Sequence, residues 1–583
     1  MLASRFLLSS QLRNWPRNQN IVRQTLRLVH TNPSFSLPPR RDAPFPATIM
    51  QNSPRKPEVD AKRRRKARPE KKEKSNGFDE VLQTDIDQLL SKNRPEDADP
   101  NAKPVLPEQF TEIEVRISVL SSTGDGLALS ENLDHVYVVP FSVPGDKVLI
   151  KVVKHFPSLS YSTADFLKVV EPGSQRDDAQ IGCGYFGKCS GCQLQMMPYE
   201  AQMAHKKRIV EKAFANFSGL IPELIPEIGE TFPSPMQYGY RTKLTPHFAG
   251  PAGAKRRGPK QAHTEVPPIG FTYKNRRNDL DIEDCPLGTD IVRRGLKSER
   301  KRVAENIGKY TKGATLLMRE STTRVPKDGS STAELAVEKE DVVENKKGVP
   351  KESGDVIRTE RDNYIEEKRC VTDPNATSIE YVDDYIFTNK AGAFFQNNNS
   401  ILSGFTEYIR ENAMPKSNDQ DPKPIKYLLD AYSGSGLFTI TLSPLFKSSL
   451  GVDVAGDSIV SARDNARENN LPNTGFAAAD AATLFKDLPY PPDQTLLVID
   501  PSRKGCSDDF LRQFLAFGPR RVVYVSCNVH TQARDIGVMV QGDEQLKIRY
   551  EIESIRGFDF FPQTGHVEGV AILNKVAIPE AAS

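Results

Sequence analysis

The sequence predicts an α/β fold: a doubly wound, mostly parallel sheet in the C-terminal third, preceded by a small OB-like β-barrel and an α+β central region. Three observations carry this prediction. Short apolar strands alternate with helical segments between residues 427 and 500, the order that produces a parallel sheet. A Gly-x-Gly turn follows the first of these strands. Residues 111–171 instead alternate apolar and polar side chains between turn signals, which is typical of a small barrel.

Length, charge and cysteine content limit the classes of protein to which this chain can belong. The 583 residues suffice for three domains and additional tails, and the net charge of +3 does not by itself indicate nucleic acid. No apolar run is long enough to span a bilayer, so we expect no membrane contact. Seven cysteines, an odd number, favour a reducing compartment and a metal or catalytic role over a disulfide scaffold. The predicted parts are a mitochondrial targeting-like segment (1–49), a basic disordered tail (50–107), the barrel (108–175), the central region (176–384) and the α/β domain (385–583).

The N-terminal segment has the composition of a targeting signal. Residues 1–41 contain seven arginines and no Asp or Glu, as mitochondrial transit peptides do. A basic cluster at residues 62–66 follows Met50 and is typical of a nuclear localisation signal or an RNA-binding arm. We therefore expect initiation at Met1 to give a mitochondrial form and initiation at Met50 a nuclear or cytosolic one. Solvated charge without function is the alternative for both segments.

A cluster of cysteines follows the barrel. Cys183, Cys189 and Cys192 lie within ten residues of one another, with glycines between them, and Cys285 is available as a fourth thiol. Four cysteine thiolates suit structural zinc or a [4Fe–4S] cluster, and the spacing does not choose between them. Ordinary buried thiols are the third possibility.

Basic residues interleaved with aromatics recur through the central region. The helical stretch 199–216 carries a predicted basic face at His205, Lys206, Lys207 and Arg208, and Arg and Lys accompany aromatics again at 240–244 and 271–277. Cations position phosphates and aromatics stack on unpaired bases, so this region is predicted to bind looped or single-stranded RNA. Residues 322–363 are rich in charged and small residues and lack the composition of a core, which predicts a disordered insertion.

The α/β domain has the features of a nucleoside-binding sheet. The strand 427–431 precedes Gly434-Ser435-Gly436, where backbone can approach a ligand at a helix N-terminus. The third glycine of the dinucleotide fingerprint is missing, which favours S-adenosylmethionine over NAD, because the former has no pyrophosphate. Asp453 ends the next strand, where a ribose is held in such sheets, and Asp500 ends the third.

One thiol lies at the end of a predicted strand. Residues 522–525 are apolar and β-branched or aromatic, and the strand stops at Ser526-Cys527-Asn528. Ligands of open α/β sheets bind at this carboxyl end. An inert core thiol is the alternative, but Cys527 has polar neighbours, which favours a reactive group.

Six motifs in order along the chain resemble the RNA (uracil-5-)-methyltransferases, most closely the eukaryotic, fungal-like tRNA enzymes that form ribothymidine in the T-loop. They are FFQNN (394–398), LLDAYSGSG (428–436), GVD (451–453), DPSRKG (500–505), SCN (526–528) and HVE (566–568). The barrel resembles a TRAM domain. Two positions depart from the family pattern, Ser502 after Asp-Pro and Val529 after SCN, and neither is a reacting group. Eukaryotic members need not keep the iron–sulfur cluster of bacterial relatives.

The resemblance implies a reaction and roles for named residues. A methyl group would pass from S-adenosylmethionine to carbon 5 of a uridine, most simply in the T-loop of tRNA, through a covalent adduct with the nucleophile Cys527; Glu568 would accept the proton. The implied cofactor-binding residues are Gln396, Tyr432, Asp453, Asp480 and Asp500. We expect a monomer with tRNA as partner. The alternatives are methylation of mitochondrial ribosomal RNA, an RNA-binding or RNA-folding protein without turnover, a nuclease, and a cytosine-5 methyltransferase.

Overall fold

A computed structural model describes residues 77–94, 104–251, 261–327, 352–415, 424–479, 485 and 488–577. The predicted targeting segment, the basic cluster after Met50 and Asp480 lie outside these residues. Among the described helices, none is long and apolar enough to cross a membrane.

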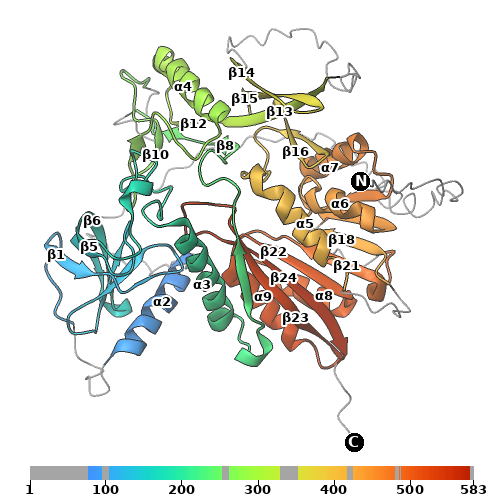
Figure 1. Ribbon diagram of the computed structural model, residues 1–583, viewed down its shortest axis with the longest axis horizontal. Helices are drawn as coiled ribbons and strands as arrows, with labels where there is room; N and C mark the ends of the chain where they lie inside the picture. Colours follow the sequence, from blue (N-terminus) through green and yellow to red (C-terminus); the bar gives the residue numbers. More distant parts are fainter. Residues whose placement is uncertain are drawn as a thin grey trace, which may run out of the picture. The chain divides into compact units, whose positions relative to one another are not determined.

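An eight-stranded sheet forms the centre of the C-terminal domain, in the order β20-β19-β18-β21-β22-β24-β23-β7 (Figure 1). The strands from β20 to β22 are parallel, β24 is antiparallel to both β22 and β23, and β7 is parallel to β23. Chain order reverses at β18, so a ligand crevice is expected at the carboxyl ends of β18 and β21. The bounds are β7 (Ile228–Phe232), β18 (Tyr427–Ala431), β19 (Ser448–Asp453), β20 (Thr474–Ala478), β21 (Thr495–Ile499), β22 (Arg521–Ser526), β23 (Ile548–Phe558) and β24 (Glu568–Ala577).

Helices cover both faces of this sheet. Alternate residues of one strand enter different cores: Val522 and Tyr524 belong to one, Val523 and Val525 to the other. Such continuous apolar strands are typical of a sheet buried on both sides. The first core includes α3 (Tyr199–Phe217), α8 (Asp508–Phe517) and α9 (Val529–Gln541). The second includes α5 (Leu402–Asn412), α6 (Leu437–Leu442) and α7 (Gly456–Glu468). The predicted doubly wound α/β domain is confirmed.

The N-terminal part of the described chain is a six-stranded sheet in the order β1-β5-β6-β4-β3-β2. Its strands are β1 (Glu112–Arg116), β2 (Val119–Leu120), β3 (Gly126–Leu129), β4 (Val136–Val139), β5 (Lys147–Phe156) and β6 (Tyr161–Glu171). The predicted disordered tail over 50–107 is wrong for its last part, because α2 (Gly77–Asn93) is a helix. Ile86 and Leu89 of α2 pack against Leu127, Val136 and Val138 of this sheet, so burial of one helical stripe stabilises it.

The central region contains α4 (Asp290–Glu305) and two four-stranded sheets, β11-β10-β9-β12 and β14-β15-β13-β8. Their strands are β8 (Lys243–Leu244), β9 (His247–Phe248), β10 (Gly270–Thr272), β11 (Asp279–Asp281), β12 (Ala314–Thr315), β13 (Met318–Pro326), β14 (Glu352–Glu360) and β15 (Tyr364–Val371). A hairpin of β16 (Thr377–Val382) and β17 (Tyr385–Lys390) follows.

Both ends of the predicted disordered insertion 322–363 are strands, so that prediction is wrong there; residues 328–351 lie outside the described residues. β13 and β14 pair with opposite sides of β15. Cross-strand ion pairs hold these strands, such as Lys368 with Glu320 at 2.8 Å and Arg358 with Glu367 at 2.7 Å. In β13 and β14, the charged side chains thus belong to paired strands and not to an unpacked chain.

The boundary between the central and α/β regions differs from the predicted one. α3 packs against α9 and β7 extends the eight-stranded sheet, although both belong to the sequence predicted as central (Figure 1). The predicted basic face of α3 is also only partly a surface, because His205 and Lys206 are buried. Residues 76–583 accordingly form one unit.

Candidate active site

Four of the predicted catalytic and cofactor residues lie at one edge of the eight-stranded sheet. Asp453 is the last residue of β19, Asp500 directly follows β21, and Cys527 directly follows β22. Glu568 begins β24, which is antiparallel to β22, and Gly569 pairs with Ser526. Because β24 runs antiparallel to β22, it begins at the edge of the sheet where β22 ends. The Cys527 thiol and the Glu568 carboxyl group therefore lie at the same edge, on adjacent strands.

The turn that carries Cys527 is fixed by its polar neighbours. Ser526 Oγ donates to the Asn528 carbonyl at 3.0 Å and accepts from the Asn528 N–H at 3.1 Å. Asn528 caps α9, because its side-chain oxygen accepts from the His530 N–H at 3.2 Å, and its amide nitrogen donates to the Arg503 carbonyl at 2.9 Å. The thiol therefore has a defined place between a buried strand and a capped helix.

The site is dry and rich in carboxyl groups. Burial first, and then the charges of Glu568 and Asp500, raise the pKa of the Cys527 thiol to about 12, although Arg503 opposes this by its charge and a hydrogen bond. Burial, then the neighbouring Asp500, raises the pKa of Glu568 well above its usual range, against the lowering effect of Arg503. Burial also raises the pKa of Asp500 to about 7. A raised pKa makes the Glu568 carboxylate a stronger base, so once ionised it is suited to accept a proton.

A turn of unusual backbone conformation follows β18. Tyr432 has a φ of 64°, uncommon for an aromatic residue, and Gly434 and Gly436 have φ values of 53° and 93°. Asp453 Oδ2 accepts from the Gly434 N–H at 3.0 Å and Oδ1 from the Ala455 N–H at 2.7 Å. No atom would meet a Cβ at Gly434 within 4 Å, which leaves open space beside this backbone. The predicted cofactor turn thus combines a strained backbone at Tyr432 with open space beside Gly434.

Asp430 is a buried carboxyl group that the sequence analysis missed. Its Oδ2 accepts from the Thr439 N–H at 2.9 Å and the Thr439 hydroxyl at 2.6 Å, which ties β18 to α6, while Oδ1 has no hydrogen-bond partner. Burial raises its pKa to about 7, and the charge of Asp430 raises that of Asp500. The position of Asp430 inside an apolar strand was the available signal, because a buried acid is rarely placed without a partner.

The segment with Phe394 and Gln396 is held from the central region. Lys243 Nζ donates to the Gly392 and Ala393 carbonyls at 3.1 Å each. Phe394 is 77% exposed and Gln396 is half-buried. The role of Gln396 toward a cofactor stays a prediction, as does that of Asp480, which lies outside the described residues.

The four predicted metal-ligating cysteines come together in the central region. Cys183, Cys189, Cys192 and Cys285 line one cavity of about 170 Å³. Within the described part of the chain, no three Cys, His, Asp or Glu side chains are arranged to hold a single metal ion. The four thiols therefore share one cavity, and their role as metal ligands stays a prediction. Cys370 and Cys506, which the sequence analysis leaves as structural, are buried elsewhere.

Known proteins are similar to this chain along most of its length. No protein-family model matches it. A "tRNA (uracil(54)-C(5))-methyltransferase" of Schizosaccharomyces pombe is 41% identical over 518 residues, 88% of this chain and 86% of the relative. The protein of the same name from Saccharomyces cerevisiae is 39% identical over 81% of this chain and 75% of its own length.

A solved structure shows the same fold. The Pyrococcus abyssi tRNA (uracil-54, C5)-methyltransferase, in complex with S-adenosyl-L-homocysteine, is 22% identical with a TM-score of 0.53, over 79% of this chain and all of that one. The likeness supports the α/β architecture described above. With the identity to the two yeast proteins across most of their length, it follows that this chain belongs to the tRNA (uracil(54)-C(5))-methyltransferase family.

Proposed function

We propose that this protein transfers a methyl group from S-adenosylmethionine to carbon 5 of a tRNA uridine, the T-loop position that the names of its relatives give as 54. The observation that carries the proposal is the placement of the Cys527 thiol and the Glu568 carboxyl group on adjacent strands at the ligand-binding edge. Glu568 is 3% exposed, and a buried carboxyl group beside a thiol has no evident structural use here.

The chemistry needs both groups. Carbon 5 of uracil is too weakly nucleophilic to accept a methyl group, and a thiolate added to carbon 6 makes it an enolate. After the methyl group is in place, a base must remove the hydrogen on carbon 5 before the thiol can leave. Cys527 supplies the nucleophile and Glu568 the base. Arg503, which hydrogen-bonds to the thiol, favours its ionised form.

The methyl donor would bind along the carboxyl ends of β18, β19 and β21. S-adenosylmethionine supplies an electrophilic methyl group on a sulfonium. Asp453 would hold the ribose hydroxyl groups, with Tyr432 beside the turn and Asp500 near the methionine end; Gln396 and Asp480 complete the proposed set. The open space at Gly434 fits the close approach of a ligand to this turn.

We also propose that the four cysteines hold a [4Fe–4S] cluster. Four thiols that line one cavity of about 170 Å³ supply the ligands that such a cluster requires. Iron and sulfide analysis of protein purified without oxygen, with a Cys192→Ser control, tests this; zinc or no metal would refute it.

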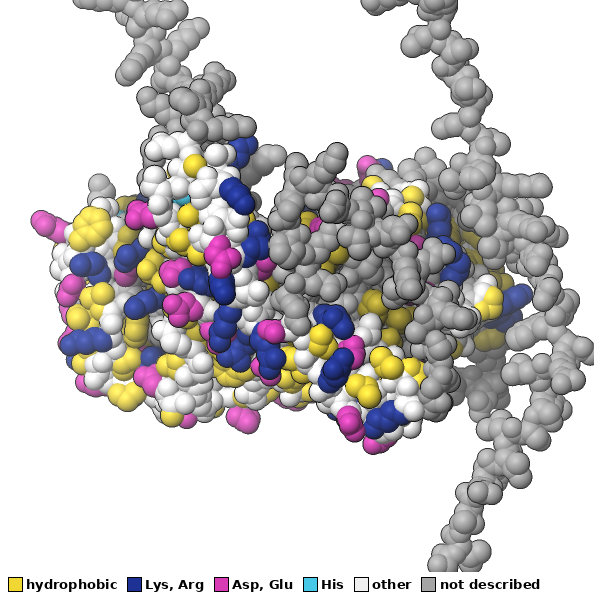
Figure 2. Space-filling model, turned by 90° about the horizontal axis from the view of Figure 1, so that it is seen from above, with side chains coloured by type: hydrophobic (Ala, Val, Ile, Leu, Met, Phe, Trp, Pro, Cys, Tyr) yellow, Lys and Arg dark blue, Asp and Glu magenta, His cyan; other side chains and the backbone are white. Residues whose placement is uncertain are grey.

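RNA contact is proposed for the exposed faces of the central region, with the protein acting as a monomer. Figure 2 shows one face on which Lys and Arg side chains lie among Asp, Glu and hydrophobic ones, as the small net charge leads one to expect. Light scattering with and without tRNA tests the monomer. The two proposed start sites, Met1 and Met50, are tested by tagging each product separately; identical localisation would refute them.

The experiment for the proposed function uses radiolabelled S-adenosylmethionine with unmodified tRNA or mitochondrial ribosomal RNA. We expect 5-methyluridine in tRNA with the wild type and none with Cys527→Ala. Labelling of ribosomal RNA alone would transfer the proposal to that substrate. No labelling of either would favour an RNA-binding protein without turnover.

A further inference from the structure

The loop between β23 and β24, residues Asp559–Val567, leads directly into Glu568. Most of its hydrogen bonds to other segments come from residues 193–240, in the central part of the chain. The Phe560 carbonyl accepts from Asn398 Nδ2 at 3.2 Å, and the Pro562 carbonyl from the Tyr240 hydroxyl at 3.2 Å. Two carbonyl groups of this loop thus accept hydrogen bonds from side chains far away in the sequence.

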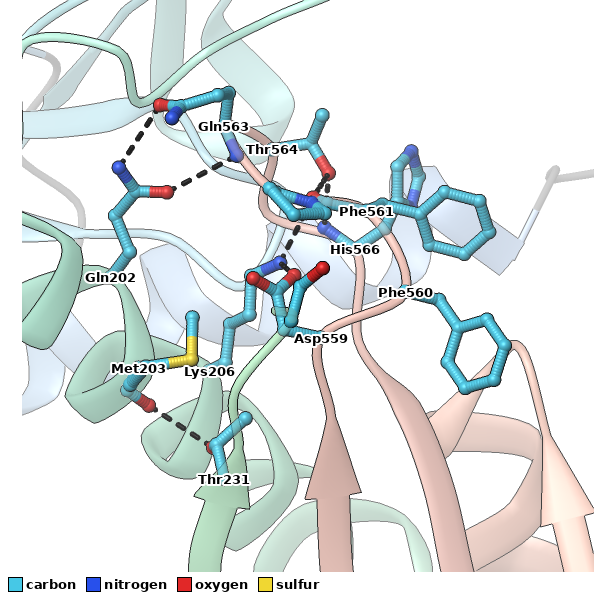
Figure 3. A network of polar contacts seen from close by, with 12 residues as sticks. Gln202, Met203, Lys206, Thr231, Asp559, Phe560, Phe561, Gln563, Thr564 and His566 are labelled. Carbon is cyan, nitrogen blue, oxygen red and sulfur yellow. Dashed lines mark hydrogen bonds and ion pairs between the residues drawn. The ribbon is translucent and has the colours of Figure 1, made fainter. Parts of the chain in front are cut away.

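The strongest of these anchors is Lys206 of α3. Its side chain and that of Asp559 are both fully buried and form an ion pair. Lys206 Nζ also donates to the Phe561 carbonyl at 3.0 Å, and the Tyr199 hydroxyl donates to Asp559 Oδ2 at 2.7 Å. Figure 3 shows the ammonium group between the Asp559 carboxylate and the loop backbone. One cation therefore fixes both the first residue of the loop and the carbonyl group two residues later.

Further contacts hold the second half of the loop. Gln202, one helical turn before Lys206, accepts from the Gln563 N–H at 3.2 Å and donates to the Gln563 side chain at 3.0 Å. Gln193 Oε1 accepts from the Gly565 N–H at 3.2 Å. A Cβ at Gly565 would lie 3.1 Å from the Gly124 Cα, so the backbones meet there. These contacts hold the second half of the loop, whereas its first half, Asp559 to Phe561, depends on Lys206.

Cys527 is held by a different set of contacts. Its turn depends on Ser526, Asn528 and the Arg503 carbonyl, none of which belongs to the Asp559–Val567 loop. A change in the loop should therefore move the base more than the nucleophile. The two chemical stages that these groups serve can be separated experimentally.

We propose that Lys206 is a positioning residue for Glu568, acting through Asp559 and Phe561, rather than a contact to RNA phosphate. The inference rests on the proposed function and concerns its last step. In that step Glu568 takes the proton from carbon 5, and the C–H electrons form the C5–C6 double bond. The C6–S bond breaks and its electrons return to the Cys527 sulfur.

The consequence is a defect in release rather than in methylation. With the nucleophile in place, thiol addition and methyl transfer continue, while a base displaced by about 1 Å can lose about 100-fold in rate. We expect Lys206→Met to accumulate methylated protein–RNA adduct and to release 5-methyluridine product slowly. The control is Arg467→Met on α7, outside the central region, which removes a surface ion pair with Asp464.

The experiment measures adduct and free product in the same labelled tRNA reaction, for wild type, both single variants and Lys206→Met combined with Asp559→Asn. The double variant leaves no buried charge unpaired, so it serves if the single variant does not fold. Adduct accumulation in the Lys206 variants, with Arg467→Met like wild type, supports the proposal.

An unchanged ratio of adduct to product overturns it, because a merely structural role lowers both in proportion to the folded fraction. Loss of tRNA binding by the Lys206 variants, with a wild-type ratio, also overturns it. Failure of the wild type to methylate RNA refutes the proposed function instead, and is recognised before any variant is compared.

Discussion

The buried setting of Cys527 predicts that its thiol reacts slowly in the free protein. The pKa of Cys527 rises from 9.0 to about 12, with burial as the first cause. At pH 8 the ionised fraction falls from about one in ten to about one in ten thousand, a factor of about 1,000. The higher basicity makes each thiolate more nucleophilic, which raises the alkylation rate by a factor of about 20 and offsets part of this loss. Alkylation of Cys527 should be about 50-fold slower than in the unfolded chain.

The assay follows iodoacetamide labelling of the peptide with Cys527 by mass spectrometry, in folded and urea-unfolded protein. In the folded protein the rate should rise about tenfold per pH unit through pH 9, where the unfolded chain approaches its plateau. Arg503→Gln should slow labelling further, because Arg503 lowers the thiol pKa. A plateau below pH 9 in the folded protein, or faster labelling of Arg503→Gln, would refute the reasoning.

Three further predictions concern the carboxyl groups and the buried ion pair. Asp453→Asn should keep the fold but weaken S-adenosylmethionine binding by about tenfold in calorimetry, because a charged hydrogen-bond acceptor is lost; unchanged affinity would contradict it. Since burial raises the pKa of Asp500 from 3.8 to about 7, the unfolded chain loses this proton first, and wild-type stability falls as pH rises from about 4 to 7. Asp500→Asn should remove this loss and gain up to about 4 kcal/mol in urea unfolding at pH 8, whereas equal pH profiles would count against it. Lys206→Met should lower the free energy of unfolding by about 3–5 kcal/mol, because it leaves the buried Asp559 carboxylate unpaired. Lys207→Met, which removes an ion pair with the exposed Glu230, should lower it by less than about 1 kcal/mol. Equal losses would show that the Lys206–Asp559 pair is not buried in solution.

The parts of the site that follow from local pattern were predictable. A strand that ends at an acid or a thiol places that group at the carboxyl edge of a parallel sheet, so Asp453, Asp500 and Cys527 could be placed without coordinates. The meeting of Cys285 with the other three thiols was a prediction from residue type alone. These inferences needed only strand direction and side-chain chemistry.

The missed features depend on partners far away in the sequence. A basic stripe on a helix looks the same whether it faces solvent or a buried acid, and the partner of Lys206 is Asp559. The parallel pairing of β7 with β23 leaves no local pattern either. α2 was missed because it lies within a charged segment: the charged composition indicated disorder, although the helical spacing of its apolar residues indicated a helix. Asp430 was taken as part of an apolar strand.

The central claim is that Cys527 and Glu568 act in succession on one uridine. Its most direct test is the covalent intermediate itself: Glu568→Gln, incubated with S-adenosylmethionine and tRNA, then digested and mapped by mass spectrometry. We predict a 5-methyluridine from position 54 joined to Cys527, and no such adduct with Cys527→Ala. Free 5-methyluridine released at the wild-type rate by Glu568→Gln, or an adduct on another cysteine, would contradict the account.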